Sequence, residues 1–215
     1  MNTRAVTAID VSGIGTALRT GDVIDDDTFD RIYPATHRHR SAVHWTPVDV
    51  ALRVSRWFSQ ARNTEALDVG AGVGKLCHVG ALATNLRWTG IERDATMVRI
   101  AGRVAHALGV ADRARFRQGE ALQVDWAAFG AVYLFNPFSE AVYAPTPDDP
   151  LARQAAYIHE VLAVERKLLT LEPGALVATY HGFGGEMPPE MKFVESVNAH
   201  AGTIELWLRC QSATT

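Results

Sequence analysis

The chain has 215 residues, of which 47% are hydrophobic and 21% are charged, and its formal net charge at pH 7 is −3. This length and composition are typical of one soluble domain with a sizeable core, and the mildly acidic balance argues against an extensive nucleic-acid-binding surface. Only two cysteines are present, and the sequence has neither an apolar leader nor an apolar run of transmembrane length. We therefore expect a cytoplasmic protein in a reducing compartment, without a membrane partner.

Residues 1–45 are read as an N-terminal extension to a main domain at 46–215. An acidic cluster within 22–30 is followed by a basic cluster at 37–40. One interpretation is a solvated, irregular extension. The other is a lid over the cofactor or a part of the substrate pocket, in which Arg38, Arg40 and the neighbouring histidines meet an anionic group. A Gly-x-Gly element at 12–16 has no clear helix after it, so we predict a loop there.

A helix is predicted to begin at Thr46-Pro47, because threonine caps helices well and proline suits the first helical turn. Asp49 would complete a capping box. The apolar residues that follow fall on one face of this helix, which we expect to pack beside the first strand. They are Val50, Val54, Trp57 and Phe58.

Strands and helices alternate through the rest of the chain, which ends in a predicted hairpin. The expected strands are at 66–70, 86–91, 114–118, 130–135, 175–181, 193–198 and 203–209. The expected helices are at 74–84, 94–108 and 151–171. This order predicts an α/β fold with a doubly wound, mostly parallel seven-strand sheet, an antiparallel C-terminal strand and helices on both faces. Residues 139–150 and 182–189 are predicted loops, because they are rich in proline or glycine.

The most informative segment is Asp68-Val-Gly-Ala-Gly-Val-Gly74, where an apolar strand runs into three alternating glycines and then a helix. Glycines let the backbone approach a ligand closely, and the first turn of a helix presents free N–H groups to it. A phosphate-binding P-loop is excluded, because Val69 and Leu76 stand where it needs glycine and a hydroxyl residue. A dinucleotide loop fits poorly, because Lys75 occupies its third glycine position.

Four fixed positions of the pattern D/E-x-G-x-G-x-G are matched by Asp68, Gly70, Gly72 and Gly74. The segment resembles motif I of the class I S-adenosylmethionine-dependent methyltransferases, which have a seven-strand, Rossmann-like fold. This resemblance covers about residues 45–210 and implies that the four residues bind S-adenosylmethionine. A carboxylate suits this cofactor, which carries an ammonium and a sulfonium and has no phosphate.

Acidic residues also follow the next two predicted strands. Glu92 lies about 20 residues after the glycines, where a carboxylate can accept hydrogen bonds from both ribose hydroxyls of this cofactor or of NAD. After the third strand, the resemblance implies that Glu120 meets the adenine amino group and that the N–H of Ala121 meets a ring nitrogen. Glu120 stands where the family commonly has aspartate.

Asn136-Pro137-Phe138 follows the fourth strand and is similar to motif IV of the amino-methylating branch of the family. In that branch, the asparagine side chain and the next carbonyl accept hydrogen bonds from the target N–H, and the aromatic ring packs against the target. The resemblance therefore implies that these three residues orient an acceptor nitrogen. The family pattern often has two prolines and this chain has one, which argues against a planar base as the acceptor.

Other polar and aromatic residues give weaker signals. The histidines are scattered without metal-ligand spacing, so no metal site is predicted. His181 ends the fifth strand on the side of the site and is a candidate base or substrate contact, with a structural histidine as the commoner alternative. Trp45, Tyr143 and Tyr180 are candidates for a substrate pocket or for the core.

We therefore predict an S-adenosylmethionine-dependent methyltransferase that N-methylates an amine, in a protein lysine or a small molecule rather than in nucleic acid. Two alternatives stay open. One is a catalytically silent protein that binds S-adenosylmethionine and acts as a partner subunit. The other is an NAD(P)-dependent oxidoreductase, which would have to tolerate Lys75 in the loop. The sequence indicates neither the acceptor itself nor the oligomeric state.

Overall fold

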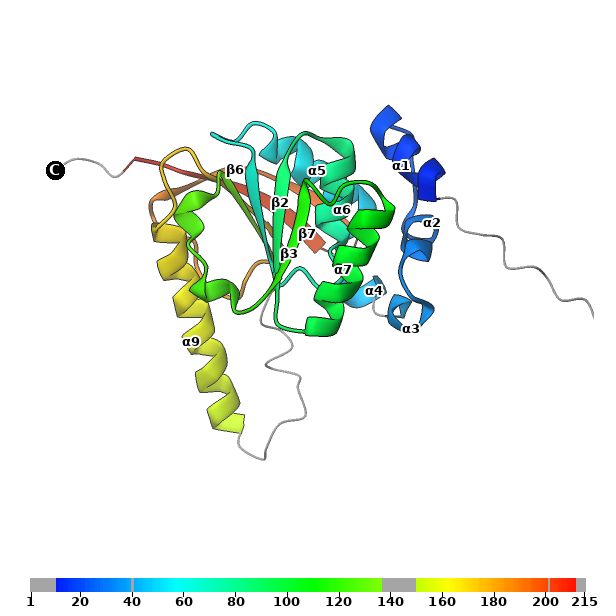
Figure 1. Ribbon diagram of the computed structural model, residues 1–215. Helices are drawn as coiled ribbons and strands as arrows, with labels where there is room; N and C mark the ends of the chain where they lie inside the picture. Colours follow the sequence, from blue (N-terminus) through cyan, green and yellow to red (C-terminus); the bar gives the residue numbers. More distant parts are fainter. Residues whose placement is uncertain (1–10, 40, 137–149, 201, 212–215) are drawn as a thin grey trace, which may run out of the picture.

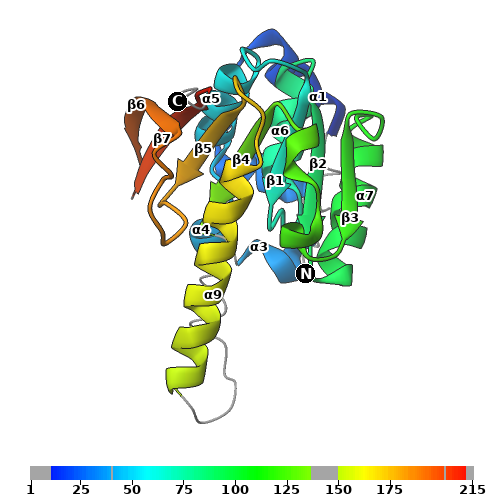
Figure 2. The same cartoon turned by 90° about the vertical axis from the view of Figure 1, so that its left-hand side faces the viewer.

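A computed structural model describes residues 11–39, 41–136, 150–200 and 202–211, and the strands within them form one sheet (Figures 1 and 2). The strands are β1 (Glu65–Val69), β2 (Arg87–Glu92), β3 (Ala114–Gln118), β4 (Ala131–Phe135), β5 (Leu176–Tyr180), β6 (Met191–Ala199) and β7 (Gly202–Arg209). Their order in the sheet is β3-β2-β1-β4-β5-β7-β6. β7 is antiparallel to β5 and β6, and the other neighbours are parallel. The predicted seven-strand sheet with a reversed C-terminal strand is confirmed.

Helices cover both faces of this sheet, as predicted (Figure 1). One face carries α5 (Val48–Phe58), α6 (Lys75–Ala83) and α7 (Ala95–Ala107). The other face carries α9 (Pro150–Leu169) and the short 3-10 turns η2 (Ala121–Gln123) and η3 (Trp126–Ala128). Asp94 caps α7, because its Oδ1 accepts a hydrogen bond from the N–H of Thr96 at 2.6 Å.

The two faces of the sheet have separate apolar cores. Phe58, Leu76 and Trp88 belong to the core under α5, α6 and α7. Leu67 belongs to the core under α9. Because successive side chains of a strand point to opposite faces, Asp68 points away from Leu67 and toward α6. A carboxylate therefore enters the side of the sheet where the helix after the glycine loop packs.

Residues 11–45 pack against the sheet domain (Figure 1). The described residues of this range are called the N-terminal segment. The segment contains α1 (Val11–Thr20), α2 (Asp26–Phe29), η1 (Asp30–Ile32), α3 (Ala35–Arg38) and α4 (Ser41–His44). Phe29 and Tyr33 are fully buried in the same core as α6. Their burial contradicts a solvated, irregular extension. The loop predicted at 12–16 is also wrong, because Ile14 and Leu18 pack against the core from one helix.

The capping box predicted at Thr46 is wrong. α5 begins at Val48, and the hydroxyl of Thr46 instead lies 3.0 Å from the hydroxyl of Tyr133 in β4. The N–H of Val48 donates to the Oδ1 of Asp26 at 2.9 Å. The N-terminal segment therefore supplies the side chain that satisfies the first turn of α5, a role that needs an acceptor oxygen from outside the helix.

The loop that the structure describes between β5 and β6 agrees with the loop predicted from the sequence. Residues 181–190 join β5 to β6 without a helix, as their glycine and proline content predicts. Most of the predicted loop at 139–150, Tyr143 included, lies outside the described residues. Within the described part of the chain, no helix is both long and apolar enough to span a membrane.

Candidate functional site

The glycine loop lies at the edge of the sheet where β1 to β4 end, as the parallel strand order predicts. Its three glycines adopt left-handed backbone conformations, with φ angles of 76° at Gly70, 55° at Gly72 and 81° at Gly74. The N–H groups of Gly70 and Ala71 both donate to the carbonyl of Ile91 at 3.0 Å. The left-handed backbone therefore explains why glycine occupies these three positions, since other residues rarely adopt this conformation.

Glu92 is joined to the glycine loop by a hydrogen bond. Its Oε2 accepts from the N–H of Gly72 at 2.9 Å, and its Oε1 accepts from the N–H of Asp94 at 2.8 Å. These bonds fix the carboxylate at the end of β2, beside the loop. Each carboxylate oxygen has a second lone pair that can accept from a hydroxyl. The role of Glu92 in ribose recognition stays a prediction.

Asp68 lies beneath the loop with 5% of its surface exposed. The thiol of Cys77 donates to its Oδ2 at 3.4 Å. Burial raises the pKa of Asp68 to about 7; the thiol hydrogen bond opposes this shift, and the nearby charge of Glu92 adds to it. Asp68 also lines a pocket of 50 Å³ together with the glycine loop. It is placed to meet a cation that enters this pocket.

Glu120 and Ala121 follow β3 along the same edge of the sheet. The Oε2 of Glu120 accepts from the Nε of Arg93 at 2.7 Å, and Arg93 also donates to Glu160 in α9 at 2.9 Å. The carbonyl of Ala121 accepts from the indole N–H of Trp126 at 2.9 Å. These contacts hold the turn after β3 in place. The adenine-binding roles of Glu120 and Ala121 stay predictions.

Asn136 and His181 follow the paired strands β4 and β5, and both have left-handed backbones, with φ of 35° and 58°. The N–H of Asn136 donates to the carbonyl of Gly182 at 3.0 Å. Non-glycine residues with positive φ are uncommon, and asparagine and histidine are enriched among them. Pro137 and Phe138, predicted with Asn136 to orient the acceptor, lie outside the described residues.

Three aromatic rings form a cluster at the ends of β4 and β5. The rings of Phe135 and His181 stack with centroids 5.6 Å apart, and the ring of Tyr180 lies 4.8 Å from Phe135 and 4.2 Å from His181. The sequence indicates Tyr180 and His181 as candidates for the site, whereas Phe135 is placed at the end of the fourth strand without a role of its own. Its position just before Asn136, at the end of an apolar strand, was the signal that could have identified it.

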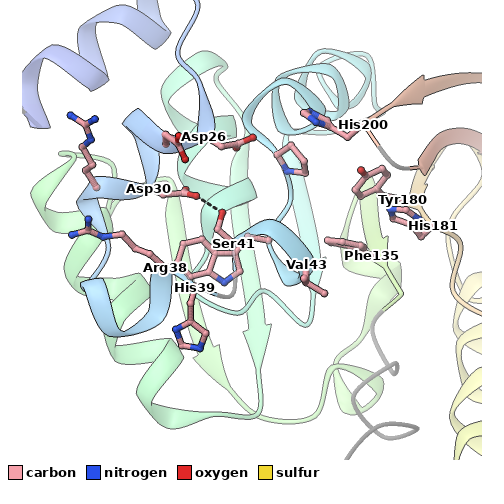
Figure 3. A pocket seen from close by; sticks show the side chains of 14 residues that line it. Asp26, Asp30, Arg38, His39, Ser41, Val43, Phe135, Tyr180, His181 and His200 are labelled. Carbon is pink, nitrogen blue, oxygen red and sulfur yellow. Dashed lines mark hydrogen bonds between the residues drawn. The ribbon is translucent and has the colours of Figure 1, made fainter.

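These rings form one wall of a cavity of 740 Å³ whose other wall is the N-terminal segment (Figure 3). Arg38 and His39 of the predicted basic cluster line it, and Arg40 lies outside the described residues. Trp45 and Phe135 line both this cavity and the pocket at the glycine loop, so the two spaces adjoin.

Comparisons with known proteins identify the fold. No protein-family model and no curated protein matches the sequence. Among solved structures, an RNA methyltransferase from Salinibacter ruber in complex with S-adenosyl-L-homocysteine is 22% identical, with a TM-score of 0.58 over 79% of this chain and 95% of that one. TrmN from Thermus thermophilus is 15% identical, with a TM-score of 0.56 over 76% and 49%. The protein has the class I methyltransferase fold.

A third similar structure is a variant of MtNAS in complex with S-adenosylmethionine, which is 12% identical with a TM-score of 0.54 over 94% of this chain and 75% of that one. Identities this low establish the fold alone. On the class I methyltransferase fold, the edge that carries Asp68, Glu92 and Glu120 here is the carboxyl edge of the parallel strands, where such sheets bind ligands.

One site contact of this methyltransferase fold was missed by sequence reasoning. Lys75, directly after Gly74, is 3% exposed, and its ammonium lies 2.6 Å from the Oδ1 of Asp26 and 2.6 Å from the Oδ1 of Asp30. The hydroxyl of Ser41 donates to the other oxygen of Asp30. A buried ion pair thus ties the N-terminal segment to the first residue of the helix after the glycine loop.

His78 is a second buried link between the N-terminal segment and the sheet domain. Its Nδ1 lies 2.9 Å from the hydroxyl of Tyr33, and its Nε2 lies 3.0 Å from the carbonyl of Ala101. Burial lowers the pKa of His78 to about 3, so the ring is neutral near pH 7. Because a carbonyl only accepts, Nε2 carries the proton and Nδ1 accepts from Tyr33. His78 therefore has a structural role.

Two glycines of the loop are expected to respond differently to alanine. A Cβ at Gly74 would overlap the ring of Phe116, whereas a Cβ at Gly72 would meet no atom within 4 Å. Gly74→Ala should therefore lower the free energy of unfolding by about 3 kcal/mol, from left-handed strain plus overpacking, and Gly72→Ala by about 1 kcal/mol from strain alone.

Urea unfolding measures this difference, and calorimetry with S-adenosylhomocysteine measures ligand binding by the two variants. We expect Gly72→Ala to fold and to lose binding, because its methyl group enters the space left open beside the loop. Equal destabilisation by the two substitutions would contradict the assignment of Gly74 to packing and Gly72 to ligand approach.

Proposed function

We propose that the protein is an S-adenosylmethionine-dependent methyltransferase that N-methylates an amine, in a protein lysine or a small molecule. The observation that carries this proposal is the pair of carboxylates at the glycine loop. Asp68 lies beneath the loop, and Glu92 holds the N–H of Gly72. Carboxylates at these two places suit a ligand with an ammonium and two ribose hydroxyls.

The same contacts argue against a ligand whose phosphates lie at the loop. A phosphate site needs free backbone N–H groups and a nearby cation. Here the N–H of Gly72 is bonded to Glu92, and the ammonium of Lys75 faces Asp26 and Asp30. A pyrophosphate beside the loop would also meet the charge of Glu92. This distribution of charge favours S-adenosylmethionine over NAD(P) and disfavours the oxidoreductase alternative.

The residues of this chain would bind and orient the reactants. The cofactor supplies a methyl group on a sulfonium, which is already a good leaving group. Asp68 would hold the cofactor ammonium, Glu92 its ribose, and Glu120 with Ala121 its adenine. Asn136, followed by Pro137 and Phe138, would orient the acceptor nitrogen toward the methyl group, so that catalysis comes mainly from positioning. The choice of nitrogen rests on the resemblance at these three residues.

Calorimetry with S-adenosylhomocysteine tests the cofactor assignment. We expect binding by the wild-type protein and at least about tenfold weaker binding by Glu92→Gln, because one charge-assisted hydrogen bond is worth about 1.4 kcal/mol or more. Glu195→Gln, at an exposed position on β6, is the matched control. Absence of binding at millimolar ligand, together with fluorescence enhancement of NADH, would instead support an oxidoreductase.

Transfer of a labelled methyl group into fractionated lysate tests the enzyme against the silent partner protein. We expect label in small molecules or protein and not in RNA. Asn136→Ala should abolish transfer and leave the calorimetric affinity for S-adenosylhomocysteine unchanged. Binding without transfer by the wild-type protein, in every fraction, would support the silent partner protein.

A further inference from the structure

We infer that the 740 Å³ cavity between the N-terminal segment and the ends of β4 and β5 is the acceptor site, and that it takes a small organic amine in its cationic form. This inference rests on the proposed methyl transfer and adds the place and the chemical class of the acceptor. It is carried by three features of the cavity: its boundary with the glycine-loop pocket, its carboxylates and its aromatic wall.

The cavity lies next to the pocket at the glycine loop, because Trp45 and Phe135 line both. A molecule in the cavity is therefore a neighbour of a ligand held by Asp68 and the loop. Its volume of 740 Å³ lies within the range of about 300 to 1,000 Å³ that is typical of small-molecule sites. The cavity has the position and the size for a small acceptor.

The carboxylates of the cavity favour a cation. Asp26, Asp27 and Asp30 line it, and the single ammonium of Lys75 pairs with Asp26 and Asp30. With Lys75 and the two arginines of the lining counted, the formal charges balance, so the attraction for a cation comes from the carboxylates that a ligand can reach. Asp30 is buried, but the side chain of Asp26 is 35% exposed and Asp27 is exposed, so both are accessible to a ligand. An ammonium group placed beside either of them would be attracted to its charge.

Two arginines also belong to the lining, and one of them lies away from the aromatic rings, on the side of Asp30. Figure 3 shows Arg38 on the side of the cavity away from Phe135 and His181. The Nε of Arg38 donates to the carbonyl of Tyr33 at 2.9 Å, which holds it against the N-terminal segment. Arg31 directly follows Asp30 in η1 and also lines the cavity. We place the amine between Asp26 and the aromatic wall, on the side away from Arg38.

The aromatic wall strengthens the preference for a cation over a neutral molecule. Phe135, Tyr180 and His181 form the cluster described above, and Trp45 belongs to the same lining. The faces of such rings attract an ammonium with about 0.5 to 2 kcal/mol. The ring of His181 packs against Gly202, where a Cβ would overlap it, so the wall is fixed in place.

A protein lysine is the alternative acceptor. A lysine side chain carries the same ammonium as a small amine. The N-terminal segment lines one side of the cavity, and a lysine peptide is the arm of the test that separates a protein acceptor from a small molecule.

The proposed reaction balances with S-adenosylmethionine as the methyl donor. The bound ammonium first loses a proton to solvent, which frees the nitrogen lone pair. A bond then forms between this nitrogen and the methyl carbon while the carbon–sulfur bond breaks, and its electron pair stays on sulfur. The products are the N-methylated amine and S-adenosylhomocysteine, and no oxidant or reductant takes part.

Titration calorimetry with n-butylammonium, n-butanol and butyrate tests the inference in the presence of saturating S-adenosylhomocysteine. The three probes have one chain length and differ in charge. We expect n-butylammonium to bind at least about tenfold more tightly than n-butanol, and butyrate not to bind. Asp27→Asn and His181→Asn should each weaken n-butylammonium binding about tenfold; asparagine tolerates the left-handed backbone at position 181.

The controls are Asp112→Asn and His159→Asn, at exposed positions outside the cavity, which should leave n-butylammonium binding unchanged. All four variants should keep the wild-type melting temperature and affinity for S-adenosylhomocysteine. Equal binding of n-butylammonium and n-butanol, or no effect of Asp27→Asn, would overturn the inference and leave the proposed function intact. Binding of a lysine peptide without n-butylammonium would overturn the small-molecule assignment. If the wild-type protein does not bind S-adenosylhomocysteine, that result would instead overturn the proposed function.

Discussion

Replacing Lys75 by methionine is expected to lower the free energy of unfolding by about 3 kcal/mol, because it leaves buried carboxylates without their counter-ion. The side chain of Lys75 is 2% exposed, and that of Asp30 is 7% exposed. Removing one partner of a buried ion pair costs about 3 to 5 kcal/mol. The lower end of this range applies here, because the side chain of Asp26 is 35% exposed and water can solvate part of its charge.

Urea unfolding followed by tryptophan fluorescence measures this loss. Trypsin cleavage at Arg31 and Arg38 should also become faster, because the N-terminal segment loses its anchor. Lys192→Met, at an exposed position on β6, is the matched control and should have no effect. The double variant Lys75→Met with Asp30→Asn should recover part of the stability, since it removes one of the two unpaired charges. Wild-type stability for Lys75→Met, within about 0.5 kcal/mol, would contradict the role of this ion pair.

Asp68→Asn is expected to make the ligand-free protein more stable at neutral pH and to abolish binding of S-adenosylhomocysteine. Burial raises the pKa of Asp68 to about 7, so the folded protein disfavours its ionised form. Asparagine has the same shape, carries no charge and can still accept from the thiol of Cys77. The carboxylate that the proposed cofactor ammonium needs is lost. Stability and binding should therefore change in opposite directions.

The stabilisation should depend on pH in a defined way. Below about pH 4, Asp68 is protonated in both the folded and the unfolded protein, and the substitution has no charge effect. Between about pH 4 and pH 7, the unfolded protein releases this proton and the folded protein keeps it, so the wild-type protein loses stability relative to Asp68→Asn. Above about pH 7 the difference is constant, at about 4 kcal/mol.

Urea unfolding of the wild-type protein and of Asp68→Asn, at a series of pH values from about 4 to 8, measures this dependence. Asp112→Asn serves as the control, because its side chain is 75% exposed. A difference in stability that does not change with pH would contradict the raised pKa. Retained affinity for S-adenosylhomocysteine in Asp68→Asn would separately contradict the assignment of this carboxylate to the cofactor.

Much of the sheet and of one edge of the site could be predicted from local sequence. The strands alternate with helices, and the carboxyl ends of parallel strands must meet at one edge. The strand order alone therefore places four candidate site residues at this edge of the sheet. They are Asp68, Glu92, Glu120 and Asn136. The helix predicted at 94–108 is also local, because its cap Asp94 accepts hydrogen bonds from N–H groups only two and three residues further on.

The rest depended on contacts between residues that are distant in the chain. Lys75 pairs with Asp26 across 49 residues, and Thr46 with Tyr133 across 87. No local pattern records such partners. The predicted capping box at Thr46 is therefore absent: the hydroxyl of Thr46 pairs with that of Tyr133 in β4, and Asp26 caps α5 instead. The burial of Phe29 and Tyr33 was not predicted for the same reason, because they become core only once the N-terminal segment has docked.

The docking of the N-terminal segment has a consequence for how the protein unfolds. Residues 11–45 contribute the aromatic core residues Phe29 and Tyr33, the counter-ions of Lys75 and the acceptor for the first turn of α5. Removing them would expose an apolar surface and leave a lysine without its ion pair. The sheet and the N-terminal segment should therefore melt together in a single transition, and a chain shortened to begin after Trp45 should not fold independently.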